Sequence, residues 1–289
     1  MKKKQIIEAI LSYHPRINNY DGCDGYKSGY EEEECTGIVL SLVPTMEVIK
    51  KTIAMGANLL IVHEPISYQT PDYPDWKGRF INSVFEEKKK FIDSHHLTIW
   101  RDHDHMHAHQ PDSIFSGVMK YLDWEQFYNR EISSAASYLY VFDIPECTVE
   151  ELGRSLIKKI GMNGLRYVGN PHDRIGRVAI VAHLYPDSFM KDEIKADGFY
   201  HSYDMELMEA MENYDIDAII PGEIIEWTIL SYIRDASYLG KRKACFNTGH
   251  FNMEELGMKY AADWVDELVR HRIGVYYLPA GDAWRYVQE

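Results

Sequence analysis

Short apolar runs alternate with amphipathic segments along most of this chain. The runs Gly37–Leu42 and Ala57–Val62 predict two buried strands, and the segment between them carries apolar residues at helical spacing. Pro44 and Thr45 are typical of the start of a helix, and Gly56 is typical of its end. This strand–helix–strand order indicates an α/β sheet with crossover helices.

The same alternation continues to the end of the chain. Further predicted helices are Ile6–Tyr13, Arg79–His95, Ile114–Leu122, Val149–Ile160, Asp204–Met211, Glu226–Leu239 and Glu254–Arg270. Further predicted strands are Leu97–Trp100, Tyr138–Phe142, Arg177–Leu184, Ala218–Pro221, Lys243–Asn247 and Val275–Leu278. The segment Asn18–Glu34 is rich in Gly, Asp, Tyr and Glu, and we expect it to be loop.

At 289 residues the chain is long enough for two domains. We expect an α/β fold made of two α/β domains with mixed sheets. Residues 1–130 plus 245–289 are expected to form a metal-binding domain, and residues 131–244 a second, inserted domain. The segments Gly56–Pro65 and Asp215–Glu223 share a polar lead, a buried strand and an acidic residue at the strand exit. This likeness fits a degenerate duplication and chance similarity equally well.

The net charge, the cysteines and the apolar runs of the chain exclude several classes of protein. A net charge of −14 argues against a nucleic-acid partner, because phosphate binding needs clustered Lys and Arg. The four cysteines form no C-x-x-C pair, which argues against a thiolate zinc site and favours free thiols in a reducing compartment. No run approaches the roughly 20 apolar residues of a membrane span, and the first residues predict an amphipathic helix, not a signal peptide. We therefore expect a cytoplasmic protein with no membrane partner.

Histidines gather in one short segment. Four of the 13 histidines lie within the ten residues W-R-D-H-D-H-M-H-A-H, together with two aspartates. Imidazole and carboxylate are the ligands that divalent transition metals prefer. A strand would bring His103, His105 and His107 to one face, whereas a turn leading into a helix would pair His103 with His107. We favour the pair, with Asp102 and Asp104 placed to orient an imidazole.

Two further pairs of a histidine and a glutamate are candidate metal ligands. His63 and Glu64 follow a buried strand, and open α/β sheets place their ligands at the carboxyl ends of strands. His250 and Glu254 stand four residues apart, which puts both on one face of a helix. Glu223 lies at the strand exit that corresponds to Glu64. It is our candidate general base for metal-bound water, the alternative being an acid that supports the ligands.

Together these residues exceed what one tetrahedral zinc ion takes. The six candidate metal ligands are His63, Glu64, His103, His107, His250 and Glu254. Two divalent ions (Zn, Mn, Fe, Ni or Co) roughly 3.5–4 Å apart would use them all. The residues thus predict a metal-dependent hydrolase that acts through metal-activated water on a small substrate, a nucleotide being one candidate. The alternative is a non-catalytic metal-binding, interaction or regulatory protein.

The order of these motifs resembles a known family. The chain resembles the Nif-three-like dinuclear metal-centre proteins in four motifs and in their order. These are A-N-L-L-I-V-H-E-P, W-R-D-H-D-H-M-H, P-G-E-I and N-T-G-H-F-N-M-E-E-L-G. Some members are named GTP cyclohydrolase I type 2 homologues. The resemblance extends from about Gly37 to Val275, and its most specific parts are the G-H-x-x-x-E motif and the histidine at the strand exit.

The resemblance implies a ligand set and an assembly. Family members show His-His-Pro, then His and Asp four apart, then His and Glu four apart. This pattern assigns metal binding to His63, His103, His250 and Glu254. Here Glu64 replaces the second His of the first motif, and His107 stands where Asp is usual. The family fold implies two α/β domains in a toroidal homohexamer with metal sites facing an inner cavity.

Overall fold

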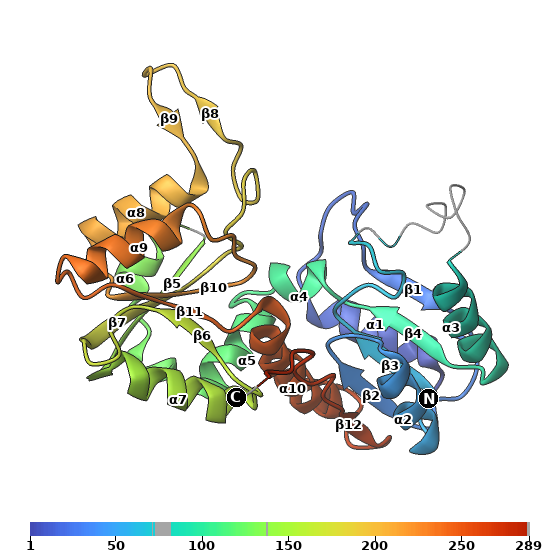
Figure 1. The fold of residues 1–289 in the computed structure, drawn as a ribbon. Coiled ribbons are helices and arrows are strands. Elements are labelled where there is room, and N and C mark those ends of the chain that lie inside the picture. Colours follow the sequence, from blue (N-terminus) through green and yellow to red (C-terminus); the bar gives the residue numbers. More distant parts are fainter. Residues whose placement is uncertain (71, 73–81, 137, 288–289) are drawn as a thin grey trace. The chain divides into compact units, whose positions relative to one another are not determined.

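The chain forms two compact units, each with its own sheet (Figure 1). The computed structural model describes residues 1–70, 72, 82–136 and 138–287. Unit 1 comprises Met1–Val118 and Glu254–Gly281, and unit 2 comprises Met119–Met253 and Asp282–Glu289. Both sheets are mixed and carry helices, so the predicted α/β class with two mixed sheets is confirmed.

The sheet of unit 1 has the strand order β1-β4-β3-β2-β12. The strands are β1 (Gly25–Ser28), β2 (Ile38–Ser41), β3 (Leu59–Val62), β4 (Thr98–Arg101) and β12 (Val275–Tyr277). The β1–β4 pair is antiparallel, and the β3–β4, β2–β3 and β2–β12 pairs are parallel. Every residue of β2, β3 and β4 is buried, as expected for parallel strands covered on both faces. This explains why their sequences are continuous apolar runs.

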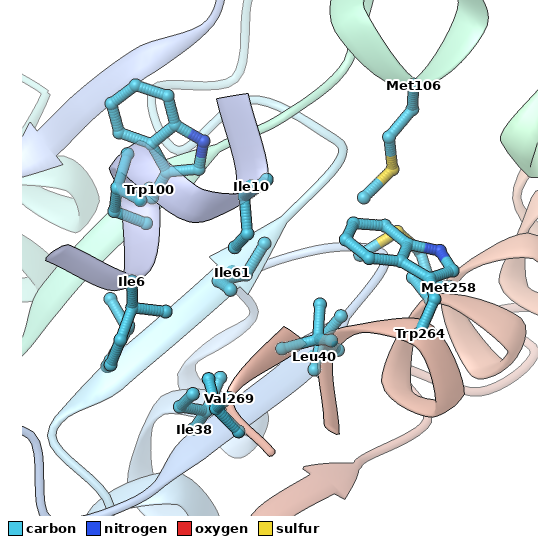
Figure 2. Packing of buried hydrophobic residues seen from close by; sticks show 14 of the residues in the cluster. Ile6, Ile10, Ile38, Leu40, Ile61, Trp100, Met106, Met258, Trp264 and Val269 are labelled. Carbon is cyan, nitrogen blue, oxygen red and sulfur yellow. The ribbon is translucent and has the colours of Figure 1, made fainter. Parts of the chain in front are cut away.

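Helices cover both faces of this sheet. They are α1 (Lys3–Tyr13), α2 (Met46–Ala54), α3 (Ser83–Ser94), α4 (Asp104–Ala108), α5 (Ser113–Leu122) and α10 (His250–Leu268). On one face Leu40 and Ile61 pack with Ile6 of α1 and Trp264 of α10 (Figure 2). Val39 belongs to the core on the opposite face, because successive side chains of a strand point to opposite sides.

The unit 2 sheet has the strand order β5-β7-β10-β11-β6. Its strands are β5 (Leu139–Thr148), β6 (Arg166–Val168), β7 (Arg174–Val181), β10 (Ala218–Pro221) and β11 (Ala244–Asn247). Its helices are α6 (Arg130–Ser133), α7 (Val149–Ile160), α8 (Tyr203–Asn213) and α9 (Ile229–Tyr238). A two-stranded ribbon, β8 (Glu193–Ile194) with β9 (Tyr200–His201), extends from this unit.

The two sheets share a core topology. In unit 1 the adjacent parallel strands β2, β3 and β4 are joined through α2 and α3, and in unit 2 the adjacent parallel strands β7, β10 and β11 are joined through α8 and α9. The last strand of each series carries an antiparallel edge strand that precedes the series in the chain, β1 or β6. The similar segments Gly56–Pro65 and Asp215–Glu223 thus contain the central strand of each sheet. This correspondence supports the degenerate duplication.

Some predicted boundaries were wrong. The segment Asn18–Glu34 was expected to be loop but contains β1, which pairs with β4 although its sequence, G-Y-K-S, has no apolar alternation. Helix α10 begins at His250 and not at Glu254. The helix predicted over Arg79–His95 is α3, and its residues 79–81 lie outside the described residues.

Two expectations about cysteines and membranes can be compared with the structure. All four cysteines are free, as their dispersal predicted. Among the described residues, every helix is either too short or too polar to cross a lipid bilayer.

Lys88 of α3 provides a test of the packing in unit 1. It is 3% exposed, and its Nζ donates a hydrogen bond of 3.0 Å to the Ile66 carbonyl oxygen. Burial lowers the pKa of Lys88 to about 8. Above that pH the native side chain loses its proton while the unfolded one keeps it up to a pH of about 10.4, so the contribution of Lys88 to stability rises with pH across this window.

We expect this rise to appear in a comparison with Lys88→Met. Between pH 7 and pH 9.5 the free energy of unfolding of the wild type should increase, relative to that of the variant, by about 2 kcal/mol. Urea denaturation at both pH values measures it, and the subtraction removes the titration of other groups. A difference that does not change with pH would contradict the lowered pKa.

Candidate metal centre

Two adjacent parallel strands deliver the candidate ligands to one edge of the sheet in unit 1. β3 and β4 pair from Leu59 opposite Thr98 to Val62 opposite Arg101, so both end at the same edge. His63 follows β3 directly. Asp102 and His103 follow β4, and α4 then carries His107. The local sequence therefore places three histidines at the carboxyl edge, where ligand sites of open α/β sheets lie.

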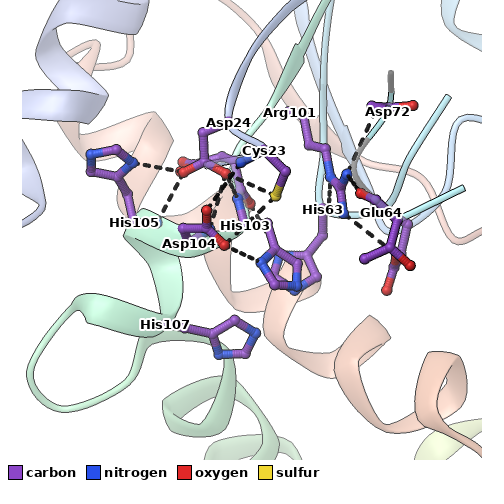
Figure 3. Close-up of polar contacts among 12 residues, drawn as sticks. Cys23, Asp24, His63, Glu64, Asp72, Arg101, His103, Asp104, His105 and His107 are labelled. Atoms are coloured by element: carbon purple, nitrogen blue, oxygen red, sulfur yellow. Dashed lines mark hydrogen bonds and ion pairs between the residues drawn. The ribbon is translucent and has the colours of Figure 1, made fainter. Parts of the chain in front are cut away.

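The imidazole rings of His63, His103 and His107 lie close together (Figure 3). The ring centroids of His63 and His103 are 4.3 Å apart, those of His63 and His107 are 5.0 Å apart, and those of His103 and His107 are 4.9 Å apart. Each ring offers a nitrogen within 4.8 Å of the nitrogens of the other two. The predicted pairing of His103 with His107 on a short helix agrees with this geometry, and His105 lies outside the group.

The other nitrogen of each ring has an oxygen partner. Nδ1 of His63 lies 3.0 Å from the Asp102 carbonyl oxygen, Nδ1 of His103 2.9 Å from Asp104 Oδ1, and Nδ1 of His107 2.9 Å from Asp112 Oδ2. A carbonyl or carboxylate oxygen favours the tautomer with its proton on Nδ1, which makes Nε2 the atom available for a metal. The same second contact is made by almost every metal-binding histidine.

Burial keeps His63 neutral. Its side chain is fully buried, and this burial lowers its pKa to about 4, with a further decrease from the nearby His103 and His107. The nearby Glu254 carboxylate raises the pKa of His63, but less than burial lowers it. The neutral imidazole is the form that binds metals, so protons do not compete for His63 near pH 7.

Carboxylates complete the group in unit 1. Glu254 Oε2 lies 3.4 Å from His63 Nε2, and Glu64 and Glu254 each offer an oxygen within 4.8 Å of the other. Behind them the buried Arg101 donates from Nε to the His63 carbonyl oxygen at 2.9 Å, and its Nη2 lies 3.9 Å from Glu64 Oε2. Unit 1 thus brings together five of the predicted ligands: His63, Glu64, His103, His107 and Glu254.

The remaining two predicted site residues lie in unit 2. His250 is the first residue of α10, one turn before Glu254, and its Nδ1 lies 3.6 Å from Glu223 Oε1. Its ring centroid is 4.6 Å from that of His183, whose Nδ1 accepts a hydrogen bond from the Glu223 amide at 3.0 Å. The Glu223 carboxylate is 59% exposed. The roles of Glu223 and His250 stay predictions.

Three residues that contact the candidate site were not predicted from the sequence. His183 lies just beyond β7, and its ring centroid is 4.6 Å from that of His250. Asp112 contacts the His107 ring. Asp24 lies in the segment expected to be loop. No spacing rule connects position 24 with position 103, so the sequence carried no signal for that contact.

Asp24 fixes the start of α4. Its carboxylate accepts hydrogen bonds from the amides of His103 (2.7 Å), Asp104 (3.0 Å) and His105 (2.9 Å). Burial alone would raise the pKa of Asp24, but these bonds and the one from the His105 ring outweigh burial and lower it. The ionised carboxylate therefore holds the N-terminus of the helix that carries His107.

The fold and the histidine cluster define an α/β protein with a candidate metal centre at a sheet edge. A model of the family described as Duf34/NIF3 (NGG1p interacting factor 3) matches residues 1–183. The chain therefore belongs to the Duf34/NIF3 family, which confirms the family resemblance found in the sequence.

Individual relatives agree with this assignment. A "GTP cyclohydrolase 1 type 2 homolog" of Clostridium perfringens is 29% identical over 194 residues, which cover 63% of this chain and 69% of that protein. A protein of the same name from Clostridium acetobutylicum is 22% identical over 261 residues, covering 88% of this chain and 85% of that protein.

Solved structures show the same fold. A Bacillus cereus protein related to NIF3 superposes with a TM-score of 0.69 at 11% identity, covering 99% of both chains. A hypothetical protein of Staphylococcus aureus gives a TM-score of 0.68 at 15% identity, also covering 99% of both chains.

Proposed function

We propose that this protein is a metal-dependent hydrolase of a small substrate, with a centre for two divalent ions. The observation that carries the proposal is the arrangement of His63, His103 and His107. Their Nδ1 atoms contact oxygens, and the rings lie within 4.3–5.0 Å of one another. Three imidazoles that each offer a nitrogen within 4.8 Å of the other two form a donor set for Zn, Mn, Fe, Ni or Co.

The carboxylates support a second ion. Three imidazoles and two carboxylates exceed the usual three protein ligands of a catalytic zinc site. We assign the first ion to the histidines of unit 1, and the second to Glu64 and Glu254. His250, one turn before Glu254 on α10, stays a candidate ligand. Glu223 stays our candidate general base. A divalent ion supplies Lewis acidity, which lowers the pKa of bound water and polarises the bond to be hydrolysed.

The residues around the ligands have defined tasks in this proposal. Asp104 and Asp112 hold the rings of His103 and His107 in one orientation, and Asp24 fixes the helix that carries His107. Arg101 lies beside Glu64 and offsets part of the negative charge of the carboxylate pair. The names of the two clostridial relatives make GTP a natural first substrate to test.

The experiment compares Glu254→Gln with Glu267→Gln. Both variants remove one negative charge from α10, but Glu267 is exposed and lies away from the ligands. The protein is stripped with a chelator, reloaded with Zn²⁺, Mn²⁺ or Co²⁺, and assayed with GTP, bis(p-nitrophenyl) phosphate and p-nitrophenyl acetate. We expect metal-dependent turnover of at least one probe. Glu254→Gln should lose on the order of 100-fold in kcat while retaining its circular dichroism, because it removes a ligand of the reacting centre.

Two results would contradict the proposal. One is equal activity of Glu254→Gln and Glu267→Gln. The other is metal binding without turnover of any probe, combined with unfolding when the ions are removed. The second result would favour the non-catalytic alternative, in which the ions stabilise the fold.

A further inference from the structure

A second cluster of ligand-type side chains lies on another side of α4. Asp24, Asp102 and His105 each offer a ligand atom, and these atoms lie within 4.8 Å of one another. His105 stands between His103 and His107 in the sequence, and residues two apart on a helix point in nearly opposite directions. In Figure 3 the His105 ring points away from the rings of His63 and His103, toward Asp24. The cluster is therefore separate from the three-histidine group.

His14 points into this second cluster. It caps the C-terminus of α1, and its side chain is completely buried. Its Nε2 lies 3.3 Å from Asp102 Oδ2. Within the described residues, neither ring nitrogen of His14 and neither carboxylate oxygen of Asp102 makes a well-formed hydrogen bond. Apart from the contact between His14 Nε2 and Asp102 Oδ2, these four buried polar atoms lack the partners that buried polar groups normally have.

An ionised Asp102 would have little compensation from the described residues. Its side chain is fully buried, as is the neighbouring Arg101, but Arg101 donates to the carbonyl oxygens of His63 and Thr70, and its ion pairs go to Glu64 and Asp72. Asp24 differs, because backbone amides stabilise its charge. A buried carboxylate whose one close polar partner is a histidine needs a cation or a proton close by.

We propose that His14, Asp24, Asp102 and His105 bind a divalent transition-metal ion at a site separate from the three-histidine group. Two imidazoles and two carboxylates are a donor set for Zn²⁺ or Co²⁺. An ion there would tie the end of α1, the segment before β1 and the exit of β4 together. Since the Asp102 carbonyl oxygen also contacts His63 Nδ1, the ion would support the orientation of that ring.

The test is a count of bound ions in the full-length protein. The protein is stripped with a chelator, saturated with Zn²⁺ or Co²⁺ and freed of excess metal by gel filtration. Metal content is measured by mass spectrometry, and the environment of Co²⁺ by visible absorption. His14→Gln is compared with His172→Gln, which changes an exposed histidine. We expect His14→Gln to bind one ion fewer than the wild type, with the loss of one component of the Co²⁺ spectrum, and His172→Gln to match the wild type.

A further variant separates the two sites. His107→Gln should weaken the three-histidine group and leave the spectral component of the His14 site in place. If His14→Gln does not fold, as judged by circular dichroism, His105→Gln replaces it. Equal ion counts in the wild type and in the folded variant would overturn the proposal, because the buried polar atoms would then bind water or a proton. The ion count does not depend on whether the protein hydrolyses any substrate.

Discussion

Replacing His103 with Gln is expected to lower the affinity for Zn²⁺ or Co²⁺ by more than about 100-fold, because the variant loses one of three ligands. The His103 ring stacks on His63 at 4.3 Å but is partly exposed, so the substitution should leave the fold intact. Affinity is measured by competition with a chromophoric chelator. Wild-type affinity in the folded variant would show that His103 is not a ligand.

A graded pair of controls sharpens this result. Asp112→Asn removes the negative charge that holds the His107 ring, and loss of such a partner typically weakens binding by about 10–100-fold. His96→Gln changes an exposed histidine that contacts Glu33 and should have no effect. We therefore expect His96→Gln to bind the metal most tightly, Asp112→Asn less tightly and His103→Gln least tightly. Equal weakening by all three would point to a general loss of stability.

Gly257→Ala is expected to destabilise unit 1 by about 2–3 kcal/mol, even though Ala favours a helix by about 1 kcal/mol over Gly. A Cβ on Gly257 would lie 2.7 Å from the Ile114 Cα, and one on Gly117 would lie 2.7 Å from the Gly257 Cα. Both contacts are with backbone, which cannot move aside as a flexible side chain can. α5 and α10 thus cross at a pair of glycines, and this crossing positions Glu254.

Gly153→Ala is the matched control. Gly153 also lies within a helix, α7, but an added Cβ would be 3.5 Å from its nearest neighbour, Phe246. We expect its free energy of unfolding to stay the same or to rise by up to about 1 kcal/mol. Urea denaturation at neutral pH gives both values. A Gly257→Ala variant as stable as Gly153→Ala would mean that the two helices do not pack this closely.

The sequence predicted the parallel strands well because burial on both faces leaves a strong signal. β2, β3 and β4 are fully buried. His63 follows β3 directly, and His103 lies two residues after the end of β4. Spacing alone also related His103 to His107, since one turn of helix separates them. Local patterns of this kind are readable because they depend on neighbouring residues.

Contacts between distant segments could not be read in this way. β1 pairs with β4 through backbone hydrogen bonds, which no apolar alternation accompanies. Asp24 binds the amides of α4 across about 80 positions of sequence, and nothing in the spacing identifies such a partner. His105 belongs to the same histidine-rich segment, but its near-complete burial beside Asp24 follows only from the fold.

A crystal structure of the zinc-loaded protein, with data collected at the zinc absorption edge, tests the three-histidine centre most directly. We expect an anomalous peak about 2.0–2.1 Å from Nε2 of His63, His103 and His107. Saturating zinc that binds elsewhere, with no peak between these three rings, would contradict it.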